Sequence, residues 1–226
     1  MTEHSLMKTK WEERKIESAI RDELLVKQKR EEIIQAASKV FAQKGYHQTT
    51  IRDISKVSGL GPGTIYNYVK KKEDILYLVY NKLTTVLTET LIETIKNHSD
   101  PMRQLENALT KTIDIVWDAQ DLIQLMYQET GALDKESMYN VLKRESNYVD
   151  YMQKILEDAK KGGIIGNRNA RLAADIIVYL LAFIPLRRWN LKKRFNEKQI
   201  KNGLVEFILN GLCVTESGKA EVSTYF

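Results

Sequence analysis

The sequence predicts an all-α fold. Apolar residues recur at helical spacing throughout the 226 residues, and no segment shows the polar and apolar alternation that is typical of a strand. Only 3 prolines and 11 glycines are present, so the chain has few of the residues that interrupt helices. The hydrophobic fraction of 43% and the charged fraction of 29% are those of a folded protein.

Three further features predict a cytoplasmic protein. Cys213 is the only cysteine, which excludes an intrachain disulfide. The amino terminus is rich in charged residues and lacks the apolar centre of a signal peptide. The longest apolar run, Ile176 to Leu186, is far shorter than the ~20 residues that cross a bilayer, so we expect no membrane-spanning segment.

Residues 1–28 form a charged N-terminal arm. Within it Ile16, Ile20 and Leu24 recur at four-residue spacing, which indicates a helix of modest amphipathicity. Three roles stay open for the arm: it lengthens the next helix, it remains solvated, or it contacts DNA beside the site described below. The cations available for such a contact are Lys8, Lys10, Arg14 and Lys15.

A bracing helix and a helix-turn-helix follow. From Lys29 to Lys44 the apolar residues form a helical stripe that ends at Gly45. A shorter helix then begins at Thr50, whose hydroxyl can cap the first turn while Asp53 completes a weak capping box. Its apolar positions recur at three-residue spacing on one face: Ile51, Ile54 and Val57.

The second helix of the motif starts after a glycine turn. Gly59 can take the left-handed conformation that ends a helix, Gly61 can serve as the next cap, and Pro62 suits a first helical position. Ile65 and Val69 point inward. The outward face is expected to hold Gly63, Thr64, Tyr66, Asn67 and Tyr68, followed by Lys70, Lys71 and Lys72.

The outward residues suit a DNA groove. Hydroxyl and amide groups can bond to phosphates or base edges, and an asparagine can pair in two ways with adenine. A glycine lets another backbone approach closely. Between Lys29 and Asp74 nine cations outnumber five anions, so most of the chain's net charge of +5 lies in this segment.

From Lys29 to Tyr80 the chain resembles the TetR family of transcriptional regulators, through the run TIRDISKVSGLGPGTIYNYVKKKEDI and the helix before it. The resemblance implies that Thr50 starts the supporting helix near the DNA backbone and that Lys72 meets a phosphate. It places on the recognition helix Gly63, Thr64, Tyr66, Asn67 and Tyr68. The sequence departs from the family pattern at Leu60 and Gly61, which replace small hydroxyl residues, and at Val69, which replaces phenylalanine.

Long helices fill the rest of the chain. We expect them at residues 73–97, 100–117, 121–130, 134–161, 168–189 and 196–212. The domain prediction is a DNA-binding domain at 29–75, a helical ligand-binding and dimerisation domain at 76–213, and a flexible tail at 214–226. The helix that begins at Glu73 is long enough to connect the two domains.

A homodimer is expected because the segment from Asp175 to Leu186 is apolar on all sides and one chain offers only half of its cover. The resemblance implies a four-helix bundle between two copies. The predicted interface residues are Leu181, Ile184, Leu204, Phe207 and Ile208. Two recognition helices related by a twofold axis enter successive major grooves about 34 to 36 Å apart, so the expected operator is an imperfect palindrome in double-stranded DNA.

The resemblance also implies a ligand cavity in the second domain. The candidate lining residues are Trp117, Met126, Tyr127, Tyr148, Met152, Tyr179 and Phe183, although such residues also suit a plain core. Polar candidates for orienting a ligand are Gln124, Gln128, Glu129 and Asn147. The expected effector is an apolar or amphipathic small molecule. An acyl-CoA is one possibility because Arg187 and Arg188 can meet its phosphates, but a hydrophobic drug is equally compatible and the arginines also suit a solvated helix end.

Nothing in the sequence indicates catalysis or a cofactor. The histidines His4, His47 and His98 are far apart and show no metal-ligand spacing. The glycines near Leu60 lack the spacing of a nucleotide-binding loop. An enzyme is therefore not expected, and the function that the resemblance implies is a ligand-released repressor. The alternatives are an activator, an architectural DNA-binding protein, or an apolar-ligand carrier without specific DNA binding.

Overall fold

The computed structural model describes residues 14–166 and 168–212. In these residues the all-α prediction is confirmed, since they form nine α-helices, one short 3₁₀ helix and no strand. Lys8, Lys10, Cys213 and the predicted flexible tail lie outside the described residues. None of the helices in the described part combines the length and apolar character that crossing a membrane requires.

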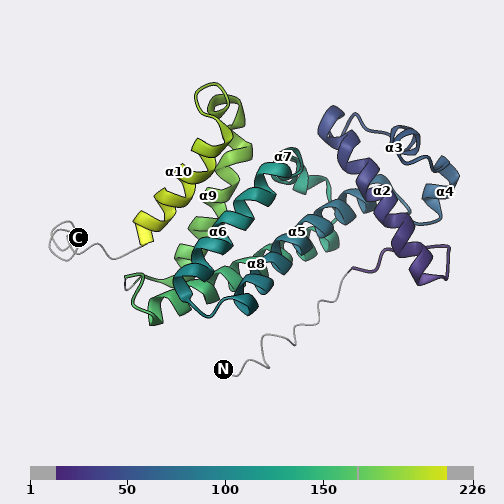
Figure 1. Cartoon of the computed structure of the whole chain (residues 1–226). Helices are drawn as coiled ribbons and strands as arrows, with labels where there is room; N and C mark the ends of the chain where they lie inside the picture. Colours follow the sequence, from purple (N-terminus) through teal and green to yellow (C-terminus); the bar gives the residue numbers. More distant parts are fainter. Residues whose placement is uncertain (1–13, 167, 213–226) are drawn as a thin grey trace. The chain divides into compact units, whose positions relative to one another are not determined.

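The described residues divide into two compact units, whose helices are labelled in Figure 1. The N-terminal unit holds the described residues up to Val79 together with Glu129–Lys143. The C-terminal unit holds Tyr80–Gln128 and the described residues from Arg144 onward. Two helices, α5 (Lys72–Asn97) and α8 (Lys135–Lys161), contribute residues to both units.

The bracing helix of the N-terminal unit is α2 (Glu23–Lys44), which starts earlier than predicted. It starts there because the carboxylate of Asp22 accepts the N–H of Leu25 at 3.0 Å and caps the first turn. Its inward stripe is buried as predicted: Ile33, Ile34, Ala37, Val40 and Phe41. This face packs against α3 (Ile51–Ser58), the first helix of the helix-turn-helix.

The predicted helix through Ile16 and Ile20 is wrong, because residues 14–22 are not helical. The backbone of this segment bonds to a distant part of the chain, and the N–H of Ala19 donates to the carbonyl of Asn67 at 2.8 Å. The four-residue spacing of the apolar residues here is therefore no sign of a helix. Ile16 is nevertheless buried.

The C-terminal unit is a bundle of helices around one apolar core. Besides parts of α5 and α8 it contains α6 (Pro101–Asp118), α7 (Gln120–Glu129), α9 (Ala170–Leu191) and α10 (Glu197–Leu212). The 3₁₀ helix η1 (Thr130–Ala132) follows α7. Helices α6, α9 and α10 pack against one another (Figure 1).

Side-chain caps set the starts of three of these helices. Asp100 accepts the N–H of Met102 at 2.9 Å before α6, where Pro101 occupies the first position. Asn169 and Asn196 begin α9 and α10 in the same way. The helices predicted for this part of the chain are therefore confirmed to within a few residues.

Candidate DNA-reading face and ligand pocket

The first helix of the helix-turn-helix is held at its start by a reciprocal cap. The hydroxyl of Thr50 accepts the N–H of Asp53 at 3.2 Å, and the carboxylate of Asp53 accepts the N–H of Thr50 at 3.0 Å. The Asp53 carboxylate also accepts from Lys44 at 2.8 Å. Hydrogen bonds from Lys44 and then Thr50 hold the pKa of Asp53 well below its ordinary value. The predicted capping box is confirmed.

The turn between the two helices needs its glycine. Gly59 has φ 73° and ψ 0°, the left-handed conformation that costs other residues free energy. The hydroxyl of Ser55 donates to the carbonyl of Leu60 at 2.6 Å and closes the turn. Pro62 then opens α4 (Pro62–Tyr66), with Gly61 as its cap. The turn therefore forms as the sequence predicts.

The recognition helix α4 divides into a buried and an exposed side. Ile65 and Val69 are fully buried, whereas Tyr66 is 52% exposed. The expectation that the Tyr68 side chain points outward is wrong, because it is 5% exposed. The helix ends at Tyr66 and the chain turns, so Tyr68 no longer follows the helical spacing. Val57 of α3, expected on the same face as Ile54, is 49% exposed, whereas Ile54 is fully buried.

Gly63 lies on the exposed side of α4 in open space. A Cβ built on it meets no atom within 4 Å, so nothing inside the protein requires glycine there. A glycine inside a helix is less favourable than alanine by about 1 kcal/mol. The residue therefore suits a face that another molecule approaches closely. Thr64, partly buried, and Asn67, exposed, flank the same face.

The three lysines after α4 are already engaged within the N-terminal unit. Lys70 pairs with Glu17, and Lys71 pairs with Asp134 at 3.0 Å. The ammonium of Lys72 donates to the carbonyls of Tyr46 at 2.9 Å and Thr49 at 3.0 Å. It also lies 4.2 Å from the centroid of the Tyr46 ring. These contacts fix Lys72 at the start of α5, beside the loop that leads to Thr50.

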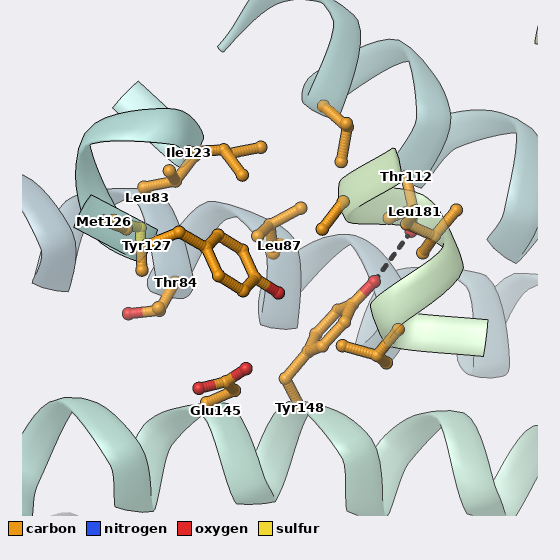
Figure 2. Close-up of a pocket in the computed structure, with 13 residues that line it drawn as sticks. Leu83, Thr84, Leu87, Thr112, Ile123, Met126, Tyr127, Glu145, Tyr148 and Leu181 are labelled. Atoms are coloured by element: carbon orange, nitrogen blue, oxygen red, sulfur yellow. Dashed lines mark hydrogen bonds between the residues drawn. The ribbon is translucent and has the colours of Figure 1, made fainter. Parts of the chain in front are cut away.

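The C-terminal unit contains an apolar pocket of about 80 Å³, drawn in Figure 2. Helices α5, α6, α7, α8 and α9 supply its walls. The lining residues are Leu83, Thr84, Leu87, Thr112, Val116, Ile123, Met126, Tyr127, Glu145, Tyr148, Val178, Leu181 and Ala182. Nearly all of this surface is carbon, so the pocket favours an apolar group.

Two polar groups of the pocket, Tyr148 and Glu145, have different surroundings. The hydroxyl of Tyr148 donates to Thr112 at 3.2 Å (Figure 2). Burial raises the pKa of Tyr148. The Glu145 carboxylate points toward Thr84 and Tyr127 in Figure 2. Burial, and then the charge of Asp175, raise the pKa of Glu145. The pocket therefore contains a carboxylate whose charged form is disfavoured.

The pocket gathers three of the seven predicted ligand residues: Met126, Tyr127 and Tyr148. Met152 is fully buried in the core, while Tyr179 and Phe183 are exposed on α9. The partly buried Trp117 lies beneath the ammonium groups of Lys192 and Lys201. The polar candidates Gln124, Gln128, Glu129 and Asn147 do not line the pocket.

Sequence reasoning missed Glu145, Thr84 and Thr112. The spacing of Glu145 three residues before Tyr148, on one face of α8, is a signal that was available. The arginines suggested for an acyl-CoA are otherwise occupied: Arg187 lies over the Trp189 ring, and Arg188 pairs with Asp121. In the part of the chain that the structure describes, no group of three His, Cys, Asp or Glu side chains could hold a metal ion.

Four of the five residues predicted at a dimer interface are buried within one chain: Leu181, Ile184, Leu204 and Ile208. They belong to the apolar core of the C-terminal unit, so their side chains are not accessible to a second copy. Phe207, the fifth, is 66% exposed. Large apolar side chains are also exposed along one side of α9: Leu172, Ile176, Tyr179 and Phe183.

A capped helix-turn-helix with an exposed recognition helix, joined to a helical unit with an apolar pocket, defines a DNA-binding transcriptional regulator. The protein-family models that match this chain belong to the same class of protein. The chain belongs to the TetR family: the model for bacterial regulatory proteins of the tetR family matches residues 33–77, and the model for the tetracyclin repressor-like C-terminal domain matches residues 98–212.

Individual relatives are transcriptional regulators rather than enzymes. The HTH-type transcriptional regulator HbdR of Aromatoleum sp. (strain CIB) is 26% identical over 197 residues, which cover 87% of this chain and 83% of HbdR. The fatty acid metabolism regulator protein of Bacillus subtilis (strain 168) is 27% identical over 194 residues, which cover 83% of this chain and 98% of that protein. The structure of FadR from Bacillus subtilis in complex with stearoyl-CoA has a TM-score of 0.68 at 26% identity, covering 80% of this chain and 98% of FadR.

Proposed function

We propose that this regulator is a homodimeric repressor that binds a palindromic operator and leaves it when an apolar or amphipathic molecule fills the pocket. The observation that carries the DNA-binding part is Gly63. Gly63 is exposed on a helix whose inward residues are buried in the core. No steric contact inside the protein requires glycine at this position. Close approach of a DNA backbone or base edge gives that glycine a purpose.

The DNA contacts follow from the positions around Gly63. Thr64, Tyr66 and Asn67 face the bases or the phosphates beside them, and Asn67 reads base edges. Thr50 contacts the backbone at the start of α3, and the ammonium of Lys72 contributes charge at the start of α5. Tyr68, which is buried, supports the recognition helix from beneath.

The proposed dimer contact uses the exposed apolar side of α9. Leu172, Ile176, Tyr179 and Phe183 recur at spacings of four, three and four, so they lie along one face of the helix. An apolar face of this length on a water-exposed surface is typical of an interaction site. Phe207 of α10 joins it, because α9 and α10 pack together. A twofold axis through this face pairs two copies of the recognition helix.

The proposed effector has an apolar chain that enters the pocket and a neutral group at its buried end. Glu145 supports the neutral end, because a second negative charge beside this buried carboxylate is unfavourable. A long-chain acyl-CoA has the matching distribution of polarity, since its tail is apolar and its charges lie at the other end. The names of two relatives, a fatty acid metabolism regulator and a protein bound to stearoyl-CoA, favour this class.

Helix α5 provides the proposed route from ligand to DNA. Leu83, Thr84 and Leu87 of this helix line the pocket, and Lys72 begins it. A ligand that favours a different position of α5 therefore changes the spacing of the two recognition helices. A ligand that binds the released form about a hundredfold more tightly shifts the equilibrium by roughly 2.7 kcal/mol.

Selection of bound sequences from random DNA tests the operator-binding part. The purified protein should enrich an inverted repeat whose half-sites lie about one helical turn, or a multiple of it, apart. Enrichment of a single unrepeated half-site would exclude binding to the operator as a homodimer. Recovery of no preferred sequence would exclude specific DNA binding and leave a ligand carrier.

A further inference from the structure

The segment Arg14–Ile20, called here the N-terminal clasp, precedes α2 and lies before the family match, which begins at residue 33. Its hydrogen bonds lie in the N-terminal unit, at the C-terminal end of the recognition helix and at the starts of α5 and α8. We propose that the N-terminal clasp positions the recognition helix, with Arg14 as its positioning residue, and thereby determines base discrimination.

The clasp bonds directly to the end of the recognition helix. A helix of five residues cannot satisfy its own last carbonyls, so groups from elsewhere must do so. The N–H of Ala19 and the hydroxyl of Ser18 donate to the carbonyl of Asn67, at 2.8 and 2.9 Å. Asn67 is the proposed base-reading residue, so the clasp holds its backbone in place.

Arg30 of α2 ties the clasp to the next carbonyl. Its guanidinium donates to the carbonyl of Tyr68 at 2.9 and 3.1 Å, and to that of Ile16 at 2.6 Å. Arg30 is partly buried, and this burial lowers the pKa of its guanidinium. One side chain therefore joins the clasp to the residue after Asn67.

Arg14 acts on the turn that follows the recognition helix, through Asp74. The backbone N–H groups of Lys70 and Lys71 donate to one oxygen of Asp74, at 2.9 and 3.1 Å. The guanidinium of Arg14 donates to the other oxygen at 3.0 Å. The Asp74 side chain is 3% exposed, so Arg14 provides the charge that a buried carboxylate needs.

Arg14 also reaches the start of α8. It donates to the hydroxyl of Ser137 at 2.5 Å and lies 3.3 Å from the carboxylate of Asp134. With its side chain 13% exposed, Arg14 is neither a solvated residue nor a free cation for DNA. Since residues 14–22 are also not helical, none of the three roles that the sequence left open for the arm describes this residue.

Two substitutions at neighbouring positions distinguish a positioning role of Arg14 from an effect of its positive charge alone. Arg14→Gln and Lys15→Gln remove the same charge from adjacent residues, but Lys15 is exposed and forms no hydrogen bond or ion pair with the described residues. Binding is measured to the duplex that the wild-type protein selects and to a scrambled duplex of equal length. Ser18→Ala, which removes one bond to Asn67 and spares Asp74, is the second variant if Arg14→Gln does not fold.

The expected result is a fall of about tenfold in the ratio of operator affinity to scrambled-DNA affinity for Arg14→Gln, equal to losing discrimination at about one base pair. The salt slope should not change, Ser18→Ala should lower the ratio by a smaller factor, and Lys15→Gln should leave it unchanged. Equal losses on both duplexes, with a salt slope lower by about one, would overturn the proposal and make Arg14 a phosphate contact.

The comparison of DNA affinities depends on the proposed operator binding. Amide hydrogen exchange without DNA gives an independent one: Arg14→Gln should speed exchange at Lys70 and Lys71 by about tenfold relative to Lys15→Gln. Unchanged exchange at both amides would overturn the clasp. If the wild-type protein selects no DNA sequence, the proposed function fails while the exchange comparison still decides the clasp.

Discussion

Glu145 and Tyr127 both line the apolar pocket, and the charge of Glu145 disfavours the ionised form of Tyr127. Burial, followed by the charge of Glu145, raises the pKa of Tyr127 to about 12. The pKa of Glu145 is itself raised above its ordinary value of 4.5 by burial and by Asp175. A negatively charged group beside Glu145 is therefore disfavoured.

Glu145→Gln should make stability less dependent on pH. Because the folded protein raises the pKa of this carboxyl, its contribution to stability is present below about pH 4.5 and is lost as the pH rises through the folded pKa. The variant should therefore be more stable than the wild type at pH 8, by about 1 kcal/mol, and lose this advantage near pH 4. Denaturant unfolding at both pH values measures it.

The matched control is Glu89→Gln, which changes an exposed carboxylate on α5. It should give the same difference in unfolding free energy at pH 4 and pH 8, within error. An equal effect of the two substitutions would show that the Glu145 carboxylate is fully hydrated.

Gly63→Ala should separate folding from DNA binding. The added methyl group meets open space and improves helix propensity, so the free energy of unfolding should stay the same or rise by up to about 1 kcal/mol. Affinity for the selected operator should fall at least about tenfold, because in the proposed complex the methyl group would separate α4 from DNA. Fluorescence anisotropy of labelled DNA measures the affinity. Gly131→Ala, also in open space, is the control, and unchanged binding by Gly63→Ala would remove α4 from the interface.

Lys72→Ala and Asn67→Ala should weaken DNA binding in different ways. The lysine variant should bind all sequences less tightly and lower the salt slope by roughly one unit, because a phosphate contact positions without reading sequence. It should also lose stability, since Lys72 bonds to the carbonyls of Tyr46 and Thr49. Asn67→Ala should relax base preference at one position. A salt slope that does not change in Lys72→Ala would mean that its ammonium serves only the loop.

Phe207→Asp and Leu204→Asp should have opposite consequences. Phe207 is 66% exposed, so its replacement should leave a folded chain that no longer dimerises and binds operator weakly. Leu204 is buried in the core, and an unpaired charge there costs several kcal/mol, so its replacement should unfold the C-terminal unit. Sedimentation and circular dichroism distinguish the two. A stable dimer of Phe207→Asp would place the interface away from this residue.

Local signals were sufficient to predict most helices. Capping and turn residues act on backbone groups a few residues away, so their effects can be inferred from spacing. The examples are Thr50 with Asp53, Gly59 with Pro62, Asp100 with Pro101, and Asn196. The family resemblance added the identity of the recognition helix.

Contacts between distant residues account for what the sequence did not predict. The segment around Ile16 shows helical spacing, yet its backbone bonds to Asn67, which is far away in the chain. Tyr68 is buried because the chain turns after Tyr66. Met126 lines the pocket, whereas Met152 is buried in the core. The packing of several helices determines which methionine takes which position, so helical spacing alone could not predict it. The same packing buries Leu181 within one chain.

The most direct test of the central claim is the release of DNA by a ligand in the pocket. The protein is bound to its selected operator and titrated with a long-chain acyl-CoA, a long-chain alcohol and CoA alone. We expect the acyl-CoA to dissociate the complex and raise the thermal stability of the free protein, the alcohol to do so more weakly, and CoA alone to do neither. If none of the three compounds changes DNA affinity or thermal stability, the ligand-released repressor is contradicted.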